Sequence, residues 1–573
     1  MKSINEPIIL YIILVDLKRW YYNYVNMKTI NIKKTIIYTF FLFYFFVGCL
    51  TYDDYGINIE EHTQLFSGAY WLNYIFEFLR IDFLQDEISQ YLKKFDADAS
   101  SLPNPSFYTY GPIFDVPTAL IDVIINTQKK TINFHYRHFL VFLIFYLTSI
   151  LVFKILIKRF NNFFLSFFGT LLYIFSPRIY GDSFHNNKDI IFLSFVVFAI
   201  YFAFKIFEEK KIKNILLFSL FAAIATSTRI MGLFLPFSLI FFLFLAKLNE
   251  DSKSNFKYIL LIIFFYLFFM YIHWPYLWDS PISNFIDFIH KTKDWIWKLG
   301  FIFNGKYIYS TSVPDSFIFI WIGISTPILN LFLFLCGFFF IGKRLLQRFI
   351  SINKKKSFNC DFWRSINEMK DNYLFFNMLV IISLIISLSA PLANAWRHLY
   401  FLNFFIIYIS AYFIMILSII LKKHIKKLII VLFFLLIPNI YKLIIFHPYQ
   451  SLYLNEILSN KNKNNFQIDR EGLTRLDSIY KILSFEQNNN KIIKIANASY
   501  LPYYRIKDGI SESGQVRIKF VGQEYQEADY IYDNYVYEVD PNHNDKYDIP
   551  SNFKKVYELE INGVKMYKIY KKI

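Results

Sequence analysis

Residues 35–62 read TIIYTFFLFYFFVGCLTYDDYGINIEEH. The part from 35 to 50 has no charged side chain, which is typical of a helix that crosses a membrane. Four carboxylates follow at once: Asp53, Asp54, Glu60 and Glu61. A carboxylate near lipid costs several kcal/mol unless it has a partner, so their position where a membrane helix ends indicates a functional role.

The rest of the chain repeats this apolar pattern. Of its 573 residues, 55% are hydrophobic and 69 are Phe. A membrane helix needs roughly 20 apolar residues, and about eleven segments approach that criterion. The predicted spans are 35–51, 138–157, 162–177, 188–207, 214–229, 231–246, 257–273, 317–341, 373–390, 399–421 and 427–446. We therefore expect a polytopic α-helical membrane protein.

The N-terminal segment 1–33 is predicted to lie in the cytoplasm. Its apolar part, 7–17, is too short for a span and precedes Lys18 and Arg19, so we interpret it as an interfacial or dispensable leader. Met27 is an alternative start. No cleavable signal peptide is expected, because no small-residue cleavage site follows the first long apolar run.

The net charge of +17 is distributed unevenly between the two sides of the predicted membrane. Lys and Arg cluster in alternate loops, the pattern of cytoplasmic loops, so nucleic acid is not an expected partner. This pattern predicts that the external segments are 52–135, 178–187, 274–316, 391–397 and everything after about 447. The three cysteines do not suggest a disulfide framework.

The predicted external segments carry most of the polar groups. In the long first loop, Glu61, Leu65, Gly68 and Leu72 share one helical face, which predicts an amphipathic helix on the membrane surface. Carboxylates and cations then share this side of the membrane. Beside Asp53, Asp54, Glu60 and Glu61, they are Asp182, Arg178, Lys188, Arg229 and Arg397.

This combination suits an enzyme that handles an anionic group beside a catalytic base. Arg binds phosphate through a planar fork of donors, and a carboxylate can accept the proton of an attacking group. Trp274 could cover a sugar face. The competing interpretations are structural: Asp53 and Asp54 would cap the helix exit, Glu60 and Glu61 would favour a helix N-terminus, and Arg178 and Arg397 would be interfacial anchors.

The segment 455–573 is predicted to be a small external α/β domain. Leu473, Leu476, Ile479 and Leu483 indicate an amphipathic helix. Strands are expected at 491–497, 516–521, 529–532, 556–561 and 564–570. Asn562-Gly563 between the last two predicts a type I′ hairpin. No catalytic group is evident in this domain, which we expect to pack over the external face.

An ordered set of short motifs resembles the GT-C superfamily of glycosyltransferases that use lipid-linked sugars. The resemblance is greatest to the bacterial branch of protein O-mannosyltransferases and aminoarabinose transferases. The motifs are Asp53-Asp54-Tyr55-Gly56-Ile57, Glu60-Glu61, Tyr110-Gly111-Pro112-Ile113-Phe114-Asp115, Ser176-Pro177-Arg178, Asn187-Lys188-Asp189, Thr228-Arg229-Ile230-Met231-Gly232, Trp274-Pro275, Thr326-Pro327, Trp396-Arg397-His398 and His447-Pro448-Tyr449-Gln450. One departure is Glu60-Glu61, where the family often has Asp-Glu.

The resemblance implies a multi-pass plasma-membrane enzyme, in the bacterial inner membrane, with GT-C-like catalytic segment 34–454. It would transfer a hexose or pentose from a polyprenyl phosphate to a lipid, glycan or protein acceptor outside the cytoplasm, usually with inversion, as part of making a cell-envelope glycan. Asp53, Asp54 or Glu61 would be the base. Glu60, Arg178, Lys188, Arg229, Trp274, Arg397 and His398 would bind substrate. No metal is expected to be needed, although the carboxylates could hold a divalent ion as in the oligosaccharyltransferase branch.

Two other functions compete with this one. A polysaccharide polymerase or ligase also uses lipid-linked sugars, but such proteins usually place their key residues in a late external loop. A lipid-linked glycan transporter or flippase would tend to bury charges at mid-membrane and to have two matching halves. The acid-rich first loop and the charges at helix ends favour the transferase.

Overall fold

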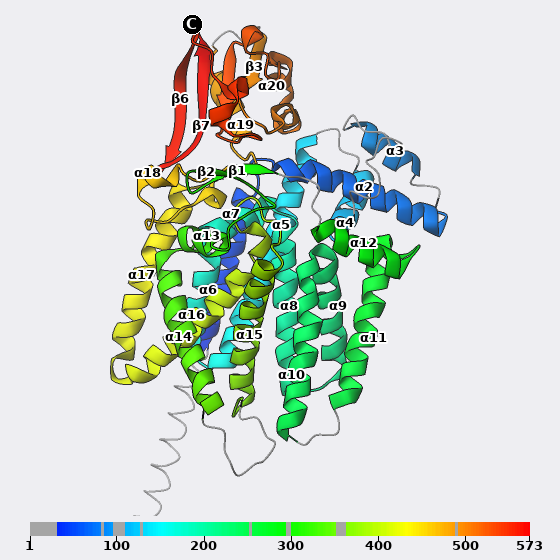
Figure 1. Ribbon diagram of the computed structural model, residues 1–573, viewed down its shortest axis with the longest axis vertical. Helices are drawn as coiled ribbons and strands as arrows, with labels where there is room; N and C mark the ends of the chain where they lie inside the picture. The colour runs from blue at the N-terminus through cyan, green and yellow to red at the C-terminus, as the bar shows by residue number, and fades with distance from the viewer. Residues whose placement is uncertain are drawn as a thin grey trace, which may run out of the picture.

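The computed structural model describes residues 31–81, 85–94, 109–125, 130–250, 255–293, 299–350, 362–486 and 491–573. Long helices form a bundle, and a small domain with a sheet stands at one end of it (Figure 1). The segment 7–17 lies outside the described residues.

Eight helices of the described part are long and apolar enough to cross a membrane, or nine if one bent pair is a single span. They are Asn31–Thr51, α5 (Lys130–Phe160), α8 (Asp189–Glu208), α11 (Asn255–His273), α14 (Ile328–Ile350), α15 (Ile366–Ser387), α16 (Leu402–Ile420) and α17 (Ile425–Ile445). The prediction of a polytopic α-helical membrane protein is therefore confirmed. Two further predicted spans form the shorter apolar helices α9 (Ile212–Thr228) and α10 (Phe234–Glu250), so the number eleven stays a prediction.

Proline changes two of the predicted segments. The single span expected at 317–341 is wrong: α13 (Phe317–Ser325) ends before Thr326-Pro327 and α14 follows. Pro327 has no N–H to donate and disfavours helical geometry at Thr326. The predicted external loop 178–187 is also mostly a helix, α7 (Pro177–His185), bent by 62° from α6 (Phe163–Ile174). Proline fits the first helical position, where no N–H is needed.

The first loop forms helices that lie across the same end of the bundle as the small domain (Figure 1). They are α2 (Ile59–Leu79), α3 (Gln85–Lys94) and α4 (Asp115–Ile125), and α12 (Pro281–Lys293) lies near them. Asn58 caps α2, and the Glu61 side chain accepts from the Asn58 N–H at 2.7 Å. This capping box satisfies donors that a helix N-terminus leaves unpaired, so the predicted surface helix begins where its sequence suggests.

The C-terminal domain contains the predicted strands. Its sheet has the order β4-β3-β5-β7-β6; β4, β3 and β5 are parallel and the last two strands form an antiparallel hairpin. Positive φ angles of 52° at Asn562 and 76° at Gly563 agree with the predicted hairpin turn. The elements are α18 (Asn460–Lys463), α19 (Arg475–Phe485), β3 (Ile493–Asn497), α20 (Glu512–Arg517), β4 (Ile518–Phe520), β5 (Tyr530–Asp533), β6 (Phe553–Ile561) and β7 (Val564–Lys572).

The segment that enters this domain is attached to a hairpin of β1 (Gly300–Phe303) and β2 (Lys306–Tyr309). The Gln467 N–H donates to the Ile302 carbonyl at 2.9 Å, and Arg470 Nη1 donates to the Gly300 carbonyl at 3.0 Å. These bonds hold residues 467–470 over the end of the bundle, and Glu471 follows directly.

The same segment contacts the start of α2. The Ile59 N–H donates to the Glu471 carbonyl at 2.9 Å, and Arg475 Nη2 donates to the Ile57 carbonyl at 2.9 Å. A Cβ added at Gly56 would lie 2.3 Å from the Leu473 carbonyl oxygen. The first loop and the C-terminal segment therefore meet backbone to backbone, which leaves no room for a side chain at residue 56.

We expect Gly56→Ala to lower the free energy of unfolding by about 1–3 kcal/mol, the usual cost of overpacking a tight contact. Thermal unfolding of the purified full chain in detergent measures this loss. Gly323→Ala is the control, because nothing lies within 4 Å of a Cβ added there. Equal unfolding temperatures of Gly56→Ala and wild type would contradict the tight contact.

Candidate active site

The corner between α7 and α8 places two buried carboxylates together. Asn186 lies at this corner, and its Oδ1 accepts from the Asp189 N–H at 2.9 Å. Its Nδ2 donates to Asp182 Oδ1 and to Asp189 Oδ2, both at 3.2 Å. Asp182 and Asp189 are each only 1% exposed. Two carboxylates held this close need nearby cations to remain charged.

Arg397 supplies one of these cations and contacts carboxylates from three separate segments. It begins the 3₁₀ turn η6 (Arg397–Leu399) and is 8% exposed. It forms an ion pair with Glu60 of α2, and its Nη1 lies 3.4 Å from Glu471 Oε1. Its Nε lies 3.8 Å from Asp189 Oδ2. The guanidinium therefore joins the first loop, the bundle and the C-terminal segment.

The electrostatics of this contact keep both partners ionised. Burial acts against the charged form of Arg397, but Glu60, Asp189 and Glu471 raise its pKa above the ordinary value. Burial likewise acts to raise the pKa of Glu60, but Arg397 holds it below the ordinary value. The Glu60 side chain remains 37% exposed, so part of this residue is open to solvent.

Arg229 is the second cation, at the junction of α9 and the 3₁₀ turn η4 (Ile230–Leu233). Its Nε donates to Asp189 Oδ1 at 2.9 Å, and its Nη2 bonds the same oxygen. Asp189 therefore lies between Arg229 and Arg397. This pairing explains how an arginine between two apolar segments is accommodated.

Lys188 is the third cation and differs from the other two. Its Nζ lies 3.2 Å from the centroid of the Tyr110 ring, and it forms no ion pair with any residue that the structure describes. Burial, together with the charge of Arg229, lowers the pKa of Lys188 to about 7. An anion that entered here would meet a cation whose charge no carboxylate neutralises directly.

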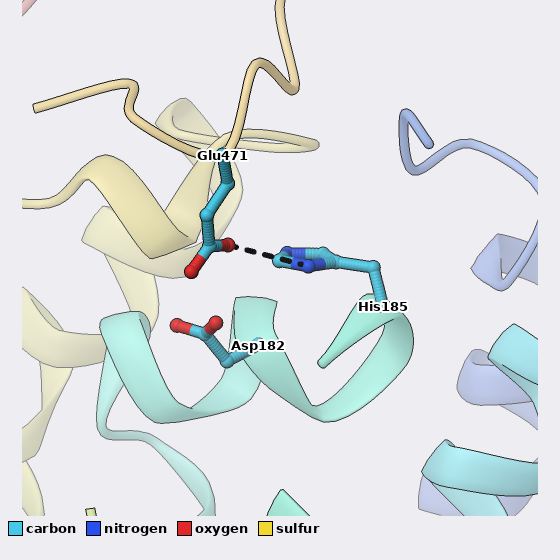
Figure 2. A group of neighbouring side chains, drawn as sticks. All are labelled: Asp182, His185 and Glu471. Carbon is cyan, nitrogen blue, oxygen red and sulfur yellow. Dashed lines mark ion pairs between the residues drawn. The ribbon is translucent and has the colours of Figure 1, made fainter. Parts of the chain in front are cut away.

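A buried group lies beside the cluster of the three cations Arg397, Arg229 and Lys188. It consists of Asp182, His185 and Glu471 (Figure 2). One possible ligand atom from each lies within 4.8 Å of the others. The Tyr400 hydroxyl donates to Asp182 Oδ2 at 2.8 Å, and His185 Nδ1 lies 3.5 Å from Glu471 Oε2. Carboxylates and imidazole are metal ligands, so these are the side chains that could hold an ion.

The predicted bases lie in two different environments. Asp53 and Asp54 are exposed, and Asp54 Oδ2 lies 2.9 Å from His447 Nε2. Neither forms an ion pair with Arg397, Arg229 or Lys188. Glu61 is 3% exposed and is used internally, in the capping box and 3.0 Å from His138 Nε2. Among the first-loop carboxylates that the structure describes, Glu60 is the one that forms an ion pair with Arg397.

Three other predicted binding residues are found around the cluster or deeper in the protein. Arg178 is buried, and its Nη2 donates to the Tyr453 carbonyl at 3.2 Å. Trp274 is fully buried and donates from Nε1 to the Thr109 carbonyl at 2.9 Å, which positions the loop before Tyr110. Burial and Arg229 lower the pKa of His398 well below the ordinary value, which favours the neutral imidazole.

Sequence reasoning missed three members of this site. Asp189 belongs to a motif of the resemblance but was not predicted to bind or react. His185 was not predicted to bind or react either, although its spacing of three residues from Asp182 on a helix was a signal that both share a face. Glu471 had no signal, since it lies in a domain predicted to have no catalytic group.

Comparison with known families adds an observation for the middle of the chain. Residues 133–274 match the model of the dolichyl-phosphate-mannose-protein mannosyltransferase family. The resemblance to the GT-C superfamily is thereby confirmed. No curated protein matches the chain.

The matched region runs from α5 to the end of α11 and contains Asp182, Lys188, Asp189 and Arg229. Together with its membrane helices, this match makes the chain a multi-pass membrane glycosyltransferase of the GT-C type. Glu60, Arg397 and Glu471 lie outside the matched region, and the fold brings them to it.

Proposed function

We propose that this glycosyltransferase moves a sugar from a polyprenyl-phosphate donor to an acceptor at the end of the bundle where α2 and the C-terminal domain lie. The observation that carries the proposal is the Arg397, Arg229 and Lys188 cluster, which contacts a partly exposed acidic residue, Glu60. The cluster lies at helix ends, where a lipid phosphate can reach it from the membrane surface.

The three cations suit the leaving phosphate. When the bond between the sugar and the phosphate breaks, negative charge develops on the phosphate oxygens, and fixed cations stabilise that charge. Arg397 and Arg229 offer planar sets of donors that match phosphate. Lys188 contributes a charge that forms no ion pair within the described part of the chain, and the Tyr110 ring contacts its ammonium.

The geometry favours Glu60 as the base rather than Asp53, Asp54 or Glu61. In the absence of donor, Glu60 pairs with Arg397. A bound phosphate would compete for that guanidinium and leave the Glu60 carboxylate free to accept the proton of the acceptor. The acceptor would then attack from the side opposite the leaving phosphate, with inversion at the sugar carbon. The acceptor is a lipid, a glycan or a protein.

The test is sugar transfer from a labelled polyprenyl-phosphate sugar pool by membranes that contain the full chain. We expect Glu60→Gln to lower kcat by about 10²–10⁴-fold, the usual contribution of a positioned base. Asp53→Asn and Asp54→Asn are the matched controls and should retain wild-type turnover, because both side chains are exposed. Glu61→Ala should lower the stability of the protein through loss of the capping box and the His138 contact.

If Glu60→Gln turns over normally while Asp53→Asn or Asp54→Asn is inactive, the base is at the helix exit and the assignment of Glu60 is wrong. A wild-type protein that consumes no donor with lipid, glycan and protein acceptors all supplied would contradict the transferase proposal. Polymerisation of a glycan or movement of intact lipid-linked glycan across the membrane would then have to be measured.

The pKa of Lys188 predicts the pH dependence of donor use. With a pKa of about 7, this ammonium loses its proton as pH rises through neutrality. The charged fraction falls from about 90% at pH 6 to about 10% at pH 8, so kcat/KM for the donor should fall by up to about tenfold. In Lys188→Arg, which stays charged, the fall should disappear; the same fall in that variant would show that another group causes it.

We also propose that this end of the bundle faces away from the cytoplasm and that the protein lies in a plasma membrane. The distribution of Lys and Arg between alternate loops supports this orientation. A reporter fused after Ile573 should be active only outside the cytoplasm, whereas one fused at Lys210, between α8 and α9, should be active only inside. The reverse result would place the cluster on the cytoplasmic side.

A further inference from the structure

His185 has one nitrogen that is held and one that has no hydrogen-bond partner. Its Nε2 lies 2.9 Å from Ser451 Oγ, whereas its Nδ1 has no hydrogen bond. Glu471 Oε2, 3.5 Å from this Nδ1, also lacks one. The two residues are only 1% and 6% exposed, and Figure 2 shows that their side chains point toward each other. Buried polar atoms in folded proteins nearly always have a partner, so this pair requires an explanation.

The spacing of the atoms suits a shared cation. A separation of 3.5 Å exceeds the usual 2.7–3.2 Å range of an N–H···O hydrogen bond. Two ligands bound tetrahedrally to one zinc ion at about 2.1 Å are about 3.4 Å apart. The third possible ligand, Asp182, lies on the same face of α7 as His185, and all three ligand atoms lie within 4.8 Å of one another. The pair farthest apart, within 4.8 Å, would have to approach by up to about 1.4 Å to surround one ion.

Each possible ligand is also oriented by neighbours outside the group. Asp182 accepts from the Tyr400 hydroxyl at 2.8 Å and from Asn186 Nδ2 at 3.2 Å. Glu471 Oε1 accepts from Asn394 Nδ2 at 2.9 Å and from Arg397 Nη1 at 3.4 Å, which leaves Oε2 directed at His185. Outer hydrogen bonds of this kind fix the ligands of metal sites.

We propose that Asp182, His185 and Glu471 bind a divalent transition-metal ion of the zinc type. Imidazole with two carboxylates suits Zn²⁺ better than Mg²⁺ or Ca²⁺, which favour oxygen ligands throughout. Three protein ligands leave a fourth position for water or a substrate oxygen. The proposed ion would replace the missing hydrogen bond between His185 and Glu471.

Glu471 connects this metal site with the cation cluster, because its other oxygen contacts Arg397. If the proposed function holds, the ion adds a positive charge on the far side of Glu471 from Arg397. It would then fix Glu471, whose backbone carbonyl also accepts from the Ile59 N–H at the start of α2. Binding of the metal itself does not depend on the proposed function.

The first test is the metal content of the purified full chain. The protein is stripped with a chelator, incubated with Zn²⁺, separated from free metal and analysed by elemental mass spectrometry. We expect about one ion per chain in wild type, and an affinity at least about tenfold lower in Asp182→Asn, His185→Gln and Glu471→Gln. His62→Gln is the matched control. His62 is a buried histidine that pairs with Asp508 away from this group, so that variant should bind the ion like wild type.

Cobalt provides a second measurement that does not depend on activity. Stripped wild-type protein with Co²⁺ should show the visible absorption of a low-coordination nitrogen and oxygen site, and the three variants should lack it. Zn²⁺ should also raise the unfolding temperature of stripped wild type but not that of the variants, since a ligand stabilises the state that binds it.

Three outcomes would overturn the inference. Wild type could take up neither ion; then a proton, not a metal, lies between His185 and Glu471. The variants could bind as much metal as wild type, which would mean an adventitious ion only. Stripped wild type could transfer sugar and unfold as before whether or not Zn²⁺ is present, which would contradict the metal site but leave the transferase proposal intact. Metal binding without any transfer would contradict the transferase proposal and support the site.

Discussion

The contact of the Arg397 guanidinium with Glu60, Asp189 and Glu471 is the interaction on which the architecture of the site depends. These carboxylates come from the first loop, the bundle and the C-terminal segment. Each would carry a large desolvation cost without a cation beside it. One buried arginine therefore links three parts of the chain that are far apart in sequence. The same arginine is the group that a phosphate would compete for. One side chain therefore both holds the three segments together and would bind the leaving group in the proposed reaction.

The proline-started helix α7 gives this arrangement its shape. Its 62° bend from α6 turns the chain back into the end of the bundle rather than out into water. Asp182 and His185 are buried as a result, and the corner at Asn186 sets Asp189 beside them. A flexible loop of the same composition would leave these groups solvated. Because of this bend, the polar residues that connect α6 and α8 line the site.

The C-terminal domain participates in the site through its first residues rather than through its sheet. Residues 467–470 are held by the β1-β2 hairpin, and Glu471 follows with its carbonyl bonded to the start of α2 and its carboxylate directed inward. The sheet domain anchors the other end of this segment through α19. Its contribution is therefore to position one carboxylate precisely enough to serve both Arg397 and His185.

The sequence by itself determined the membrane class, the surface helix after the first span, the C-terminal strands and hairpin, and the presence of cations and acids on one side. These follow from local patterns: apolar length, helical and strand periodicity, and an Asn-Gly turn. Only the tertiary structure decided which carboxylate meets the cations. Asp53, Asp54, Glu60 and Glu61 are alike in sequence, but Asp53 and Asp54 are exposed after the first span, whereas Glu60 in the first turn of α2 reaches Arg397. Glu471 could not be found at all, because its partners Arg397 and His185 lie 74 and 286 positions away and only packing brings them together.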